Sequence, residues 1–477
     1  MADEKTAMAP GEETPAKFVP ALTEEHQKSI IRKLDVRIIP WSSWLYLLNY
    51  LDRTNMSSVK IANSEAKNDV LTELHLTDAD WQLAISIFFI GYIFLEIPSN
   101  LMIKRFGPSR WLARIIVSWG IVAMCLAFCQ NLGGLVAARF MLGVCEAGYF
   151  PGMIFYFALW YSKKEIAMRF SLFYCSGQLA GAFGGLASYG ISFMNGVGGY
   201  SGWRWIFIME GIPSILSGIL TWFILPDFPH TAKWLTDEEK AWCEGRMGAN
   251  APSAHSKHFD KKEFMEVMTN PHSYMYTFIY LSNNIASQAL TFWLPTIIKN
   301  LGFTSTTALL LTVPPWICAY FISLTFSWNS DRTQRRVTHV VCAEAVFGIG
   351  LLLFATVPPS GAGLGVLYFA CFVATAGSAS FIPCVWAWRT STASGTTGNA
   401  IASGLMNSFG NVGGAIGPFL FRSDWAPRYV PAFTITTCLT VVCMTLVITE
   451  DTWAKRDKAR KAAAAAAAAT TTESTSA

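Results

Sequence analysis

Residues 100–110 read NLMIKRFGPSR, and residues 327–336 read SWNSDRTQRR. Both segments are short and basic, and each one joins two apolar runs that are long enough to cross a membrane as helices. The two segments hold the same place in their halves of the chain, between the second and the third apolar run. We therefore expect two similar halves, each with its own series of helices.

The composition indicates helices in a lipid environment. Apolar residues make up 52% of the chain and charged residues only 14%, whereas a soluble domain has about 25% charged residues. The net charge of +4 is too small for a nucleic-acid-binding surface. The cysteines form no C-x-x-C pair, so neither a disulfide framework nor a metal site is expected. Composition thus argues against a secreted or cytosolic enzyme.

The apolar runs form two series of six, which predicts an all-α membrane protein with 12 transmembrane helices in two six-helix halves. The runs cover residues 38–61, 81–103, 111–130, 132–159, 170–194 and 204–225, then 273–298, 305–328, 337–357, 364–388, 399–421 and 429–449. The expected parts are an N-terminal tail 1–36, bundles 37–225 and 272–449, a linker 226–271 and a low-complexity tail 450–477. Within the linker, Thr236 and the acids after it predict a capped helix.

Lysine and arginine residues are unevenly shared between the two sets of loops. If the N-terminus is cytoplasmic, the inner loops hold ten of them, and the outer loops with the helix ends hold six. The ten are Lys104, Arg105, Arg110, Lys163, Lys164, Arg169, Arg332, Arg335, Arg336 and Arg389. The positive-inside rule and the lack of a signal-peptide pattern in the polar tail therefore predict that both termini are cytoplasmic.

Five further segments narrow the fold class. They are 50–55 (YLDRTN), 139–152 (RFMLGVCEAGYFPG), 202–211 (GWRWIFIMEG), 234–239 (WLTDEE) and 410–418 (GNVGGAIGP). With these segments and the two basic loops, the chain resembles the major facilitator superfamily. Within it, the chain is similar to the anion:cation symporter family, which includes fungal permeases for allantoate, nicotinate and pantothenate. The resemblance covers the whole chain and implies a secondary transporter.

The two basic loops correspond to a signature of that superfamily in the loops after the second and the eighth helix. The resemblance implies gating roles for Lys104, Arg105, Arg110, Asp331, Arg332 and Arg335. In the first loop, Asn100 and Lys104 stand where the superfamily usually has Gly and Asp.

Asp52 and Arg53 are neighbours inside the first apolar run. A charged side chain at the centre of a membrane helix costs roughly 2.5 to 3.5 kcal/mol, so the charges that remain there usually face a cavity or a partner. Adjacent side chains leave a helix about 100° apart, which suggests two separate roles. We expect Arg53 to face a central cavity and bind an anion, and Asp52 to face the fourth apolar run. A simple ion pair at the outer helix end is the alternative.

Arg139 and Glu146 lie seven residues apart, and therefore on one helix face, with Gly143 between them. The glycine leaves room for a neighbouring helix or for water. A carboxyl group in such a place can exchange protons, which a proton-coupling site requires. The resemblance implies that Asp52 and Glu146 take part in proton coupling and that Arg139 interacts with them. A structural buried salt bridge is the alternative.

Other polar residues in the apolar runs are candidates for substrate contacts. Tyr92 and Glu96 share a helix face. The resemblance implies that Tyr92 contacts the substrate, whereas Glu96 is either a second titratable group or a helix–helix hydrogen-bond partner. Gln178 precedes a set of glycines and is a candidate donor to a substrate carboxylate.

The second half contributes a polar stripe that includes Asn407 and Asn411, which lines a cavity or joins helices. Asn283 is expected to complete the site from the seventh apolar run. For Glu210 and Glu344, which also lie within apolar runs, we expect structural pairing with inner-loop arginines or with the backbone.

Together these patterns predict a proton-coupled symporter of a small organic anion, such as a vitamin, a ureide or a dicarboxylic acid. The expected partners are this anion, protons and the lipid bilayer of the plasma membrane, with no cofactor and no nucleic acid, and the chain is expected to be monomeric. A nutrient receptor and an uncoupled facilitator or exporter remain alternatives. An enzyme is disfavoured, because the apolar runs carry no nucleophile–base pair.

Overall fold

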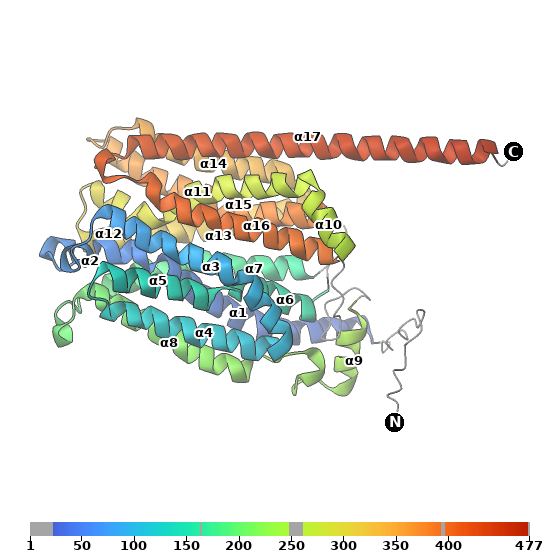
Figure 1. The fold of residues 1–477 in the computed structure, drawn as a ribbon, viewed down its shortest axis with the longest axis horizontal. Coiled ribbons are helices and arrows are strands. Elements are labelled where there is room, and N and C mark those ends of the chain that lie inside the picture. The colour runs from blue at the N-terminus through green and yellow to red at the C-terminus, as the bar shows by residue number, and fades with distance from the viewer. Residues whose placement is uncertain (1–21, 163–164, 248–260, 393–395, 476–477) are drawn as a thin grey trace, which may run out of the picture.

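The computed structural model describes residues 22–162, 165–247, 261–392 and 396–475. Over these ranges the protein is a bundle of helices without β-strands, and its long helices run nearly along one common axis (Figure 1). We call the end of the bundle that carries α9 and α10 the linker end, and the end that carries α2 and α12 the loop end.

The N-terminal half contains α1 (Glu24–Ile61), α2 (Val70–Glu73), α3 (Asp78–Phe106), α4 (Pro108–Cys125), α5 (Leu132–Glu146), α6 (Tyr149–Trp160), α7 (Ile166–Ser192) and α8 (Gly202–Ile224). The linker contributes α9 (Asp237–Gly245) and α10 (Lys261–Thr269). The C-terminal half contains α11 (Pro271–Asn300), α12 (Ser305–Leu311), α13 (Val313–Thr333), α14 (Arg336–Thr356), α15 (Gly363–Thr392), α16 (Thr396–Ile416) and α17 (Val430–Thr475). Short 3-10 turns are η1 (Ser64–Ala66), η2 (Leu126–Phe128), η3 (Val197–Gly199), η4 (Pro229–Thr231), η5 (Gly417–Leu420) and η6 (Ser423–Trp425).

Eight helical stretches of the described residues are long and apolar enough to cross a membrane. They comprise α3, α4, α5 with α6, α8, α12 with α13, α14, α15 and α17. The helices α1, α7, α11 and α16 run through the same bundle but are less apolar, and they carry the buried polar residues Asp52, Gln178, Asn283 and Asn407. Buried charged residues also occur in the more apolar helices, such as Glu146 of α5 and Glu210 of α8.

Three helix pairs make the most extensive contacts between the two halves, which are α1 with α11, α3 with α16, and α7 with α13, and α7 also packs against α12 and α15. Two of the less apolar helices form the first pair, and each of the other two pairs contains one. Polar groups of the interior thus lie at or near the boundary between the halves.

Two long helices extend beyond the boundaries expected from hydropathy. Helix α1 begins at Glu24, where the Thr23 hydroxyl accepts a hydrogen bond from the His26 backbone N–H. Two acids in its first turn suit the positive end of the helix dipole. Helix α17 continues past residue 449 to Thr475 and projects from the linker end (Figure 1). Its alanine run has the highest helix propensity and contains no stop signal.

The fourth long segment of the N-terminal half is broken into α5 and α6 directly after Glu146. Gly148 at the break has φ +87°, and a Cβ there would overlap the Ser99 side chain. Only glycine tolerates both conditions, because it has no Cβ and adopts positive φ readily. The break leaves Glu146 as the last residue of α5, at a helix end inside the bundle.

Gly143 allows α5 to touch α3, so the expectation of a neighbouring helix at this glycine is confirmed. A Cβ at Gly143 would overlap the Phe88 carbonyl oxygen and would lie 3.0 Å from the Tyr92 backbone nitrogen. Backbone atoms cannot rotate aside, so a larger residue would force the two helices apart.

The capped linker helix that the sequence predicts is confirmed in α9. The Thr236 hydroxyl accepts a hydrogen bond from the Glu239 backbone N–H at 3.3 Å, and the Glu239 carboxylate accepts one from the Thr236 backbone N–H at 3.0 Å. This reciprocal pair is a capping box. It holds the Glu239 carboxylate in a defined position at the start of α9.

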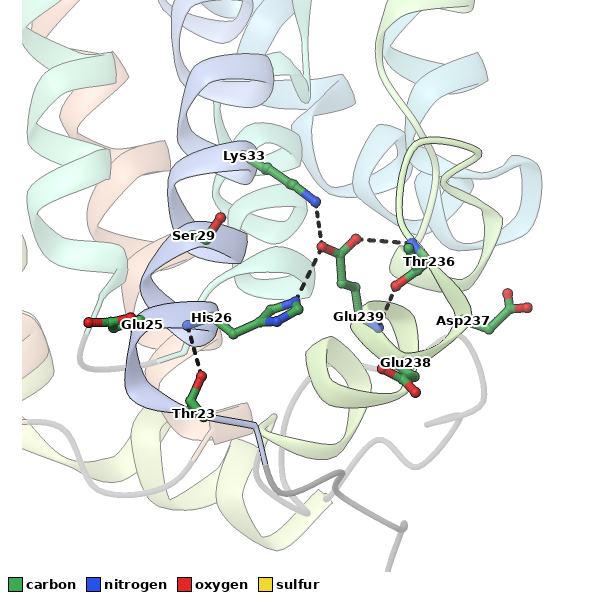
Figure 2. Close-up of a pocket in the computed structure, with 9 residues that line it drawn as sticks. All are labelled: Thr23, Glu25, His26, Ser29, Lys33, Thr236, Asp237, Glu238 and Glu239. Carbon is green, nitrogen blue, oxygen red and sulfur yellow. Dashed lines mark hydrogen bonds and ion pairs between the residues drawn. The ribbon is translucent and has the colours of Figure 1, made fainter.

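The same carboxylate joins α9 to α1 (Figure 2). Lys33 Nζ lies 2.5 Å from Glu239 Oε1, and His26 Nε2 lies 3.7 Å from it. Burial opposes the charged form of Glu239. The hydrogen bonds from Lys33 and from the Thr236 backbone outweigh burial, so the pKa of Glu239 lies below its usual value. A second ion pair, Arg246 with Glu165 at 2.9 Å, fastens the other end of α9. The linker helix is thereby docked on the N-terminal half.

We expect Gly143→Ala to lower the free energy of unfolding by about 1–3 kcal/mol, because the new methyl group meets backbone. Gly190→Ala is the matched control, since Gly190 lies in helix α7 with no atom within 4 Å of its virtual Cβ. The control should be neutral or slightly stabilising. Denaturant unfolding in nanodiscs measures both variants, and equal stabilities would contradict the close approach.

We expect Glu239→Gln to speed hydrogen exchange of the α9 amides about tenfold at pH 7, since a hydrogen bond to a charged group contributes about 1.5–3 kcal/mol. A lowered pKa means that the contribution is fully present above the unfolded-state value of about 4.3 and is lost as the pH falls through the lower pKa of the folded protein. The ratio of variant to wild-type exchange rates should therefore approach one only at an acid pH well below about 4.3. Glu238→Gln, on the exposed side of α9, serves as the control and should exchange like wild type at both pH values.

Candidate functional site

An ion pair between Arg53 of α1 and Glu146 of α5 lies at the centre of the N-terminal half. Arg53 Nε donates to Glu146 Oε1. The Glu146 side chain is fully buried, while 15% of the Arg53 side chain remains exposed. The other Glu146 oxygen, Oε2, has no hydrogen-bond partner. The guanidinium is thus the more accessible member of a nearly dry pair.

Two aromatic rings of α3 enclose the Arg53 guanidinium. Its Cζ lies 4.7 Å from the centroid of the Tyr92 ring and 5.3 Å from that of the Phe88 ring. Rings at such distances stabilise a cation through their electron-rich faces. The sequence-predicted residues Arg53, Tyr92 and Glu146 are therefore brought together by three different helices.

Asp52 points away from this pair, towards α4 and α8. Its Oδ2 accepts hydrogen bonds from Trp119 Nε1 at 3.1 Å and from Ser214 Oγ at 2.8 Å, whereas Oδ1 has no partner. Its hydrogen-bond partners belong to the third and the sixth apolar runs. Adjacent side chains do diverge as expected, but it is Arg53 that reaches α5, because its longer side chain extends to the end of that helix.

Arg139 is fully buried and forms no ion pair with Glu146 in the described part of the protein. Its Nε donates to the Ala84 backbone oxygen at 3.3 Å, and its Cζ lies 5.0 Å from the Phe88 ring centroid. Both terminal nitrogens, Nη1 and Nη2, lack hydrogen-bond partners. A buried guanidinium with two unused donors is costly, so this residue is poised to accept an acidic group.

Glu96 links the two halves one helical turn beyond Tyr92. Its Oε1 accepts a hydrogen bond from Asn407 Nδ2 at 2.6 Å, and its Oε2 accepts one from Ser408 Oγ at 2.9 Å. Asn411 Nδ2 in turn donates to the Asn407 backbone oxygen at 3.1 Å. Two roles were considered for Glu96, and the structure shows it as a helix–helix hydrogen-bond partner.

Two other candidates lie apart from the Arg53 pair. Asn283 donates to Glu344 Oε2 at 2.8 Å and is directed into the C-terminal half. Glu344 is therefore paired with an amide, and the expectation that it pairs with an arginine or the backbone is wrong. Gln178 is buried in α7 with 5% exposure, and no hydrogen bond to Arg53 connects it within the described residues.

The basic loops lie at the linker end. In the second loop, Asp331 Oδ1 lies 3.7 Å from Arg336 Nη2, Arg332 packs 5.4 Å from the Trp328 ring, and Arg335 precedes α14. In the first loop, Arg105 and Arg110 are exposed. The side chain of Lys104 lies outside the described residues.

Asp227 contacts the first basic loop, a role that the sequence pattern does not predict. It follows α8, and its Oδ1 accepts a hydrogen bond from the Ser109 backbone N–H at 2.8 Å, at the start of α4. A Cβ at the neighbouring Gly107, which has φ +88°, would lie 3.0 Å from the same oxygen. An acid at this helix start is favourable. Asp227 thus supplies, from a distant segment, a carboxylate that the loop itself lacks.

A polar cluster closes the boundary between the halves at the loop end. Lys60 Nζ lies 2.8 Å from Asp78 Oδ1 and 3.7 Å from the centroid of the Trp293 ring on α11. Ser64 and Ser305 share a hydrogen bond of 2.7 Å between the halves. Further links of the same kind are Lys299 to Ser64, the Ser305 backbone N–H to Glu65, and Gln82 to the Phe421 backbone oxygen.

An aromatic cluster closes the boundary nearer to the linker end. The Trp386 ring of α15 lies 6.2 Å from Phe150, 6.5 Å from Phe170 and 5.9 Å from Tyr280, measured between ring centroids. Phe150 also lies 5.9 Å from Tyr46 of α1. The Arg53 pair is therefore shielded on both sides, by polar contacts towards one end and by aromatic rings towards the other.

Two hollows lie outside the immediate surroundings of the pair. A recess of about 790 Å³ opens between the start of α1 and α9, next to Lys33 and Glu239 (Figure 2). It lies roughly 30 Å along α1 from Arg53, at about 1.5 Å per residue. A cavity of about 20 Å³, lined in part by Thr54, Thr291 and Trp316, lies between the halves. It holds no more than a single water molecule, so a larger ligand there requires the halves to separate.

No group of three or more His, Cys, Asp or Glu side chains suited to a metal ion occurs among the residues that the structure describes. Glu210 of α8 is buried without the pairing expected from the sequence, because neither of its carboxyl oxygens has a hydrogen-bond partner. Its position within an apolar run marks it in the sequence as a buried acid. The structure adds that no cation compensates its carboxyl group among the described residues.

Comparisons with known proteins give one family and two similar transporters. The family profile described as Major Facilitator Superfamily matches residues 43–418. The MFS transporter prlL of a fungal species (strain NRRL 50135) is 36% identical over 412 residues, which cover 86% of this chain and 83% of that protein. A protein of Agrobacterium vitis that is named as a tartrate transporter is 30% identical over 421 residues, which cover 87% and 88% of the two chains.

Among solved structures, a bacterial homologue of the human lysosomal transporter Spinster, in an inward-facing and unoccupied conformation, has a similar fold. The TM-score is 0.60 at 15% identity, and the match covers 90% of this chain and 96% of that one.

We expect Arg53→Met and Glu146→Gln to destabilise the protein less together than the sum of the two single changes. Breaking a buried pair leaves an uncompensated group and costs about 3–5 kcal/mol, and residues in contact are coupled by up to about 3 kcal/mol. Denaturant unfolding in nanodiscs measures the stability of wild type, of the two single variants and of the double variant. The exposed pair Arg422 and Asp424, 2.8 Å apart, is the control and should show little coupling. Additive effects at Arg53 and Glu146 would rule out the pair as an energetic unit.

Proposed function

Because the chain belongs to the Major Facilitator Superfamily and its relatives are named transporters rather than enzymes, we propose that it carries a small organic anion together with protons by alternating access. The observation that carries this proposal is the ion pair between the partly exposed Arg53 and the fully buried Glu146. The relative named for tartrate supports a carboxylate as the class of substrate.

Arg53 is the proposed anion-binding residue. Its Nε is engaged by Glu146, while the rings of Phe88 and Tyr92 hold the guanidinium from the α3 side. A carboxylate fits the fork of a guanidinium with two parallel hydrogen bonds. An incoming anion therefore competes with Glu146 for the same cation. Tyr92 is positioned to contact the substrate beside it.

Charge balance couples this competition to protons. The pair of Arg53 and Glu146 is neutral in a nearly dry environment. When an anion takes over the guanidinium, an ionised Glu146 would be left buried without its cation, which costs several kcal/mol. Binding a proton to Glu146 restores neutrality, so anion and proton are favoured together.

Asp52 and Arg139 are the proposed neighbours in this exchange. Asp52 has one oxygen without a partner, and Arg139 has two terminal nitrogens without one. Arg139 is available to donate to the protonated Glu146 carboxyl group once Arg53 holds the anion, because both residues occupy one face of α5. Asp52 provides a second place for a proton on the opposite side of α1.

The C-terminal half supplies most of the remaining proposed contacts, and α7 of the N-terminal half supplies Gln178. Asn407 and Asn411 of α16 reach the boundary next to Glu96, and Gln178 and Asn283 occupy the helices α7 and α11 that adjoin it. Amide groups can donate to the hydroxyl or carboxylate oxygens of a substrate once the halves separate.

Alternating access requires that each closure opens in turn. The polar contacts around Lys60 and Ser64 would break to admit the anion from the loop end, and the rings around Trp386 would part to release it at the linker end. The basic loops with Arg105, Arg110 and Asp331 are the proposed conformational controls. We place 12 membrane spans in bundles 37–225 and 272–449, with both termini and the linker 226–271 in the cytoplasm of a plasma-membrane protein that acts as a monomer.

Uptake into proteoliposomes tests the proposal. With acid outside, wild type should accumulate at least one member of a radiolabelled panel of tartrate, nicotinate, pantothenate and allantoate. Arg53→Ala should lower the initial rate at least tenfold, since a charge-assisted hydrogen bond contributes about 1.5–3 kcal/mol. Glu146→Gln should retain anion exchange but lose the response to the pH gradient.

Arg422→Ala, at an exposed site of the loop end, is the control and should transport like wild type. Equal anion levels inside and outside under the gradient would indicate facilitated diffusion and exclude symport. Wild-type uptake by Arg53→Ala would exclude this residue as the anion site.

A further inference from the structure

Glu210 is a deeply buried carboxyl group that the transport mechanism above does not use. It lies in α8 with 4% exposure, and neither carboxyl oxygen has a hydrogen-bond partner. An isolated carboxylate in such a place is among the most costly groups in a protein, because burial removes its hydration and nothing replaces it. A neutral carboxyl group at the same position costs far less.

Glu210 lies next to Asp52, the carboxyl group proposed above as a second place for a proton. Ser214, one helical turn after Glu210, donates to Asp52 Oδ2 at 2.8 Å, and the same hydroxyl lies 3.3 Å from the Glu210 backbone oxygen. Residues four apart on a helix are neighbours on one face. The Asp52 carboxyl group is therefore fixed against the face of α8 from which Glu210 projects.

The surroundings of Glu210 contain a second acid but no compensating cation within the described part of the chain. From α1, Asp52 acts on it electrostatically, and the Asn55 amide is near enough to interact with the carboxyl group, although the atoms of the two side chains do not meet hydrogen-bond geometry. From α4, Arg114 packs on the Trp111 ring at 4.0 Å, and Arg110 on the Trp222 ring at 6.0 Å.

The remaining elements packed against α8 add no charge to this place. From α7, Arg169 is held by Asp35 at 2.6 Å. The turn η2 contains only the apolar residues 126–128. Asp52 is thus the ionisable group that bears on Glu210.

We propose that Glu210 is a second proton-binding site of the protein, and that it forms with Asp52 a coupled pair of carboxyl groups. The two acids cannot both be ionised in this dry environment, because each would face a like charge as well as the loss of water. The pair therefore retains at least one proton. When Asp52 releases its proton, Glu210 keeps its own, and the reverse exchange moves the charge between α1 and α8 without changing their sum.

This inference rests on the proposed function in taking Asp52 as a proton carrier. It extends the proton site of the N-terminal half from the pair of Arg53 and Glu146 to the α8 side of α1.

Infrared difference spectroscopy of the full chain in liposomes, titrated with pH and without any substrate, tests the proposal. Wild type should show the carbonyl stretch of a protonated glutamate with few hydrogen bonds, and glutamate labelled with ¹³C at the carboxyl group should shift this band but not an aspartate band. Glu210→Gln should abolish it. Asp52→Asn should move its titration towards acid by about one pH unit, because the neighbouring negative charge is gone.

Glu344→Gln is the matched control, since Glu344 is a buried carboxyl group of the other half that is held by Asn283. It should remove a different band and leave the Glu210 titration unchanged. A labelled spectrum without a protonated glutamate band that depends on Glu210, or a titration of that band unaffected by Asp52→Asn, would overturn the proposal.

The isotope experiment uses wild-type protein, so the absence of any protonated glutamate band would overturn the proposal even if a variant does not fold. It is also independent of uptake. Loss of gradient-driven transport with the coupled titration intact would count against the proposed function alone, and gradient-driven transport without that titration would count against the pair alone.

Discussion

The contact between Arg53 and Glu146 imposes the main constraint on the structure, because it places two opposite charges in contact inside a largely apolar bundle. Each charge is tolerable only while the other is close. The surrounding helices serve this requirement in different ways. Gly143 lets α3 approach α5, which brings the Phe88 and Tyr92 rings beside the guanidinium, and the break at Gly148 ends α5 at Glu146. A change in any of these features alters the environment of the pair before it alters the fold.

The other buried carboxyl groups accept hydrogen bonds from neutral donors. Glu96 takes two hydrogen bonds from α16, Glu344 takes one from Asn283, and Asp52 takes two from α4 and α8. Each arrangement compensates a carboxyl group with neutral donors instead of a cation. The N-terminal half also holds Arg139, whose terminal nitrogens have no hydrogen-bond partner. This half therefore contains both a buried cation and the buried carboxyl groups that proton transfer requires. The C-terminal half contributes amides and hydroxyls instead.

Hydropathy and helix signals predicted much of this architecture, because they depend on local sequence. The helical bundle and the capped start of α9 at Thr236 follow from apolar runs and from a capping pattern. The pairing of Arg53 with Glu146 did not follow, since the spacing of Arg139 and Glu146 on one helix says nothing about a longer side chain that reaches in from α1. Asp227 was missed for the same reason, as it caps α4 from a segment more than a hundred residues away in the chain. The extent of α1 before residue 37 was missed because polar residues form helices that hydropathy cannot detect.

The two closures beside the central pair differ in chemistry, and this difference has a thermodynamic consequence. The contacts around Lys60, Asp78 and Ser64 are ionic and polar and adjoin the aqueous surface, so dissolved salt weakens them within a Debye length of about 8 Å. The rings around Trp386 respond little to salt, and their association strengthens on moderate warming from the cold. Higher ionic strength and moderate warming therefore both shift the balance towards opening at the loop end, and the medium itself biases the resting state of the carrier.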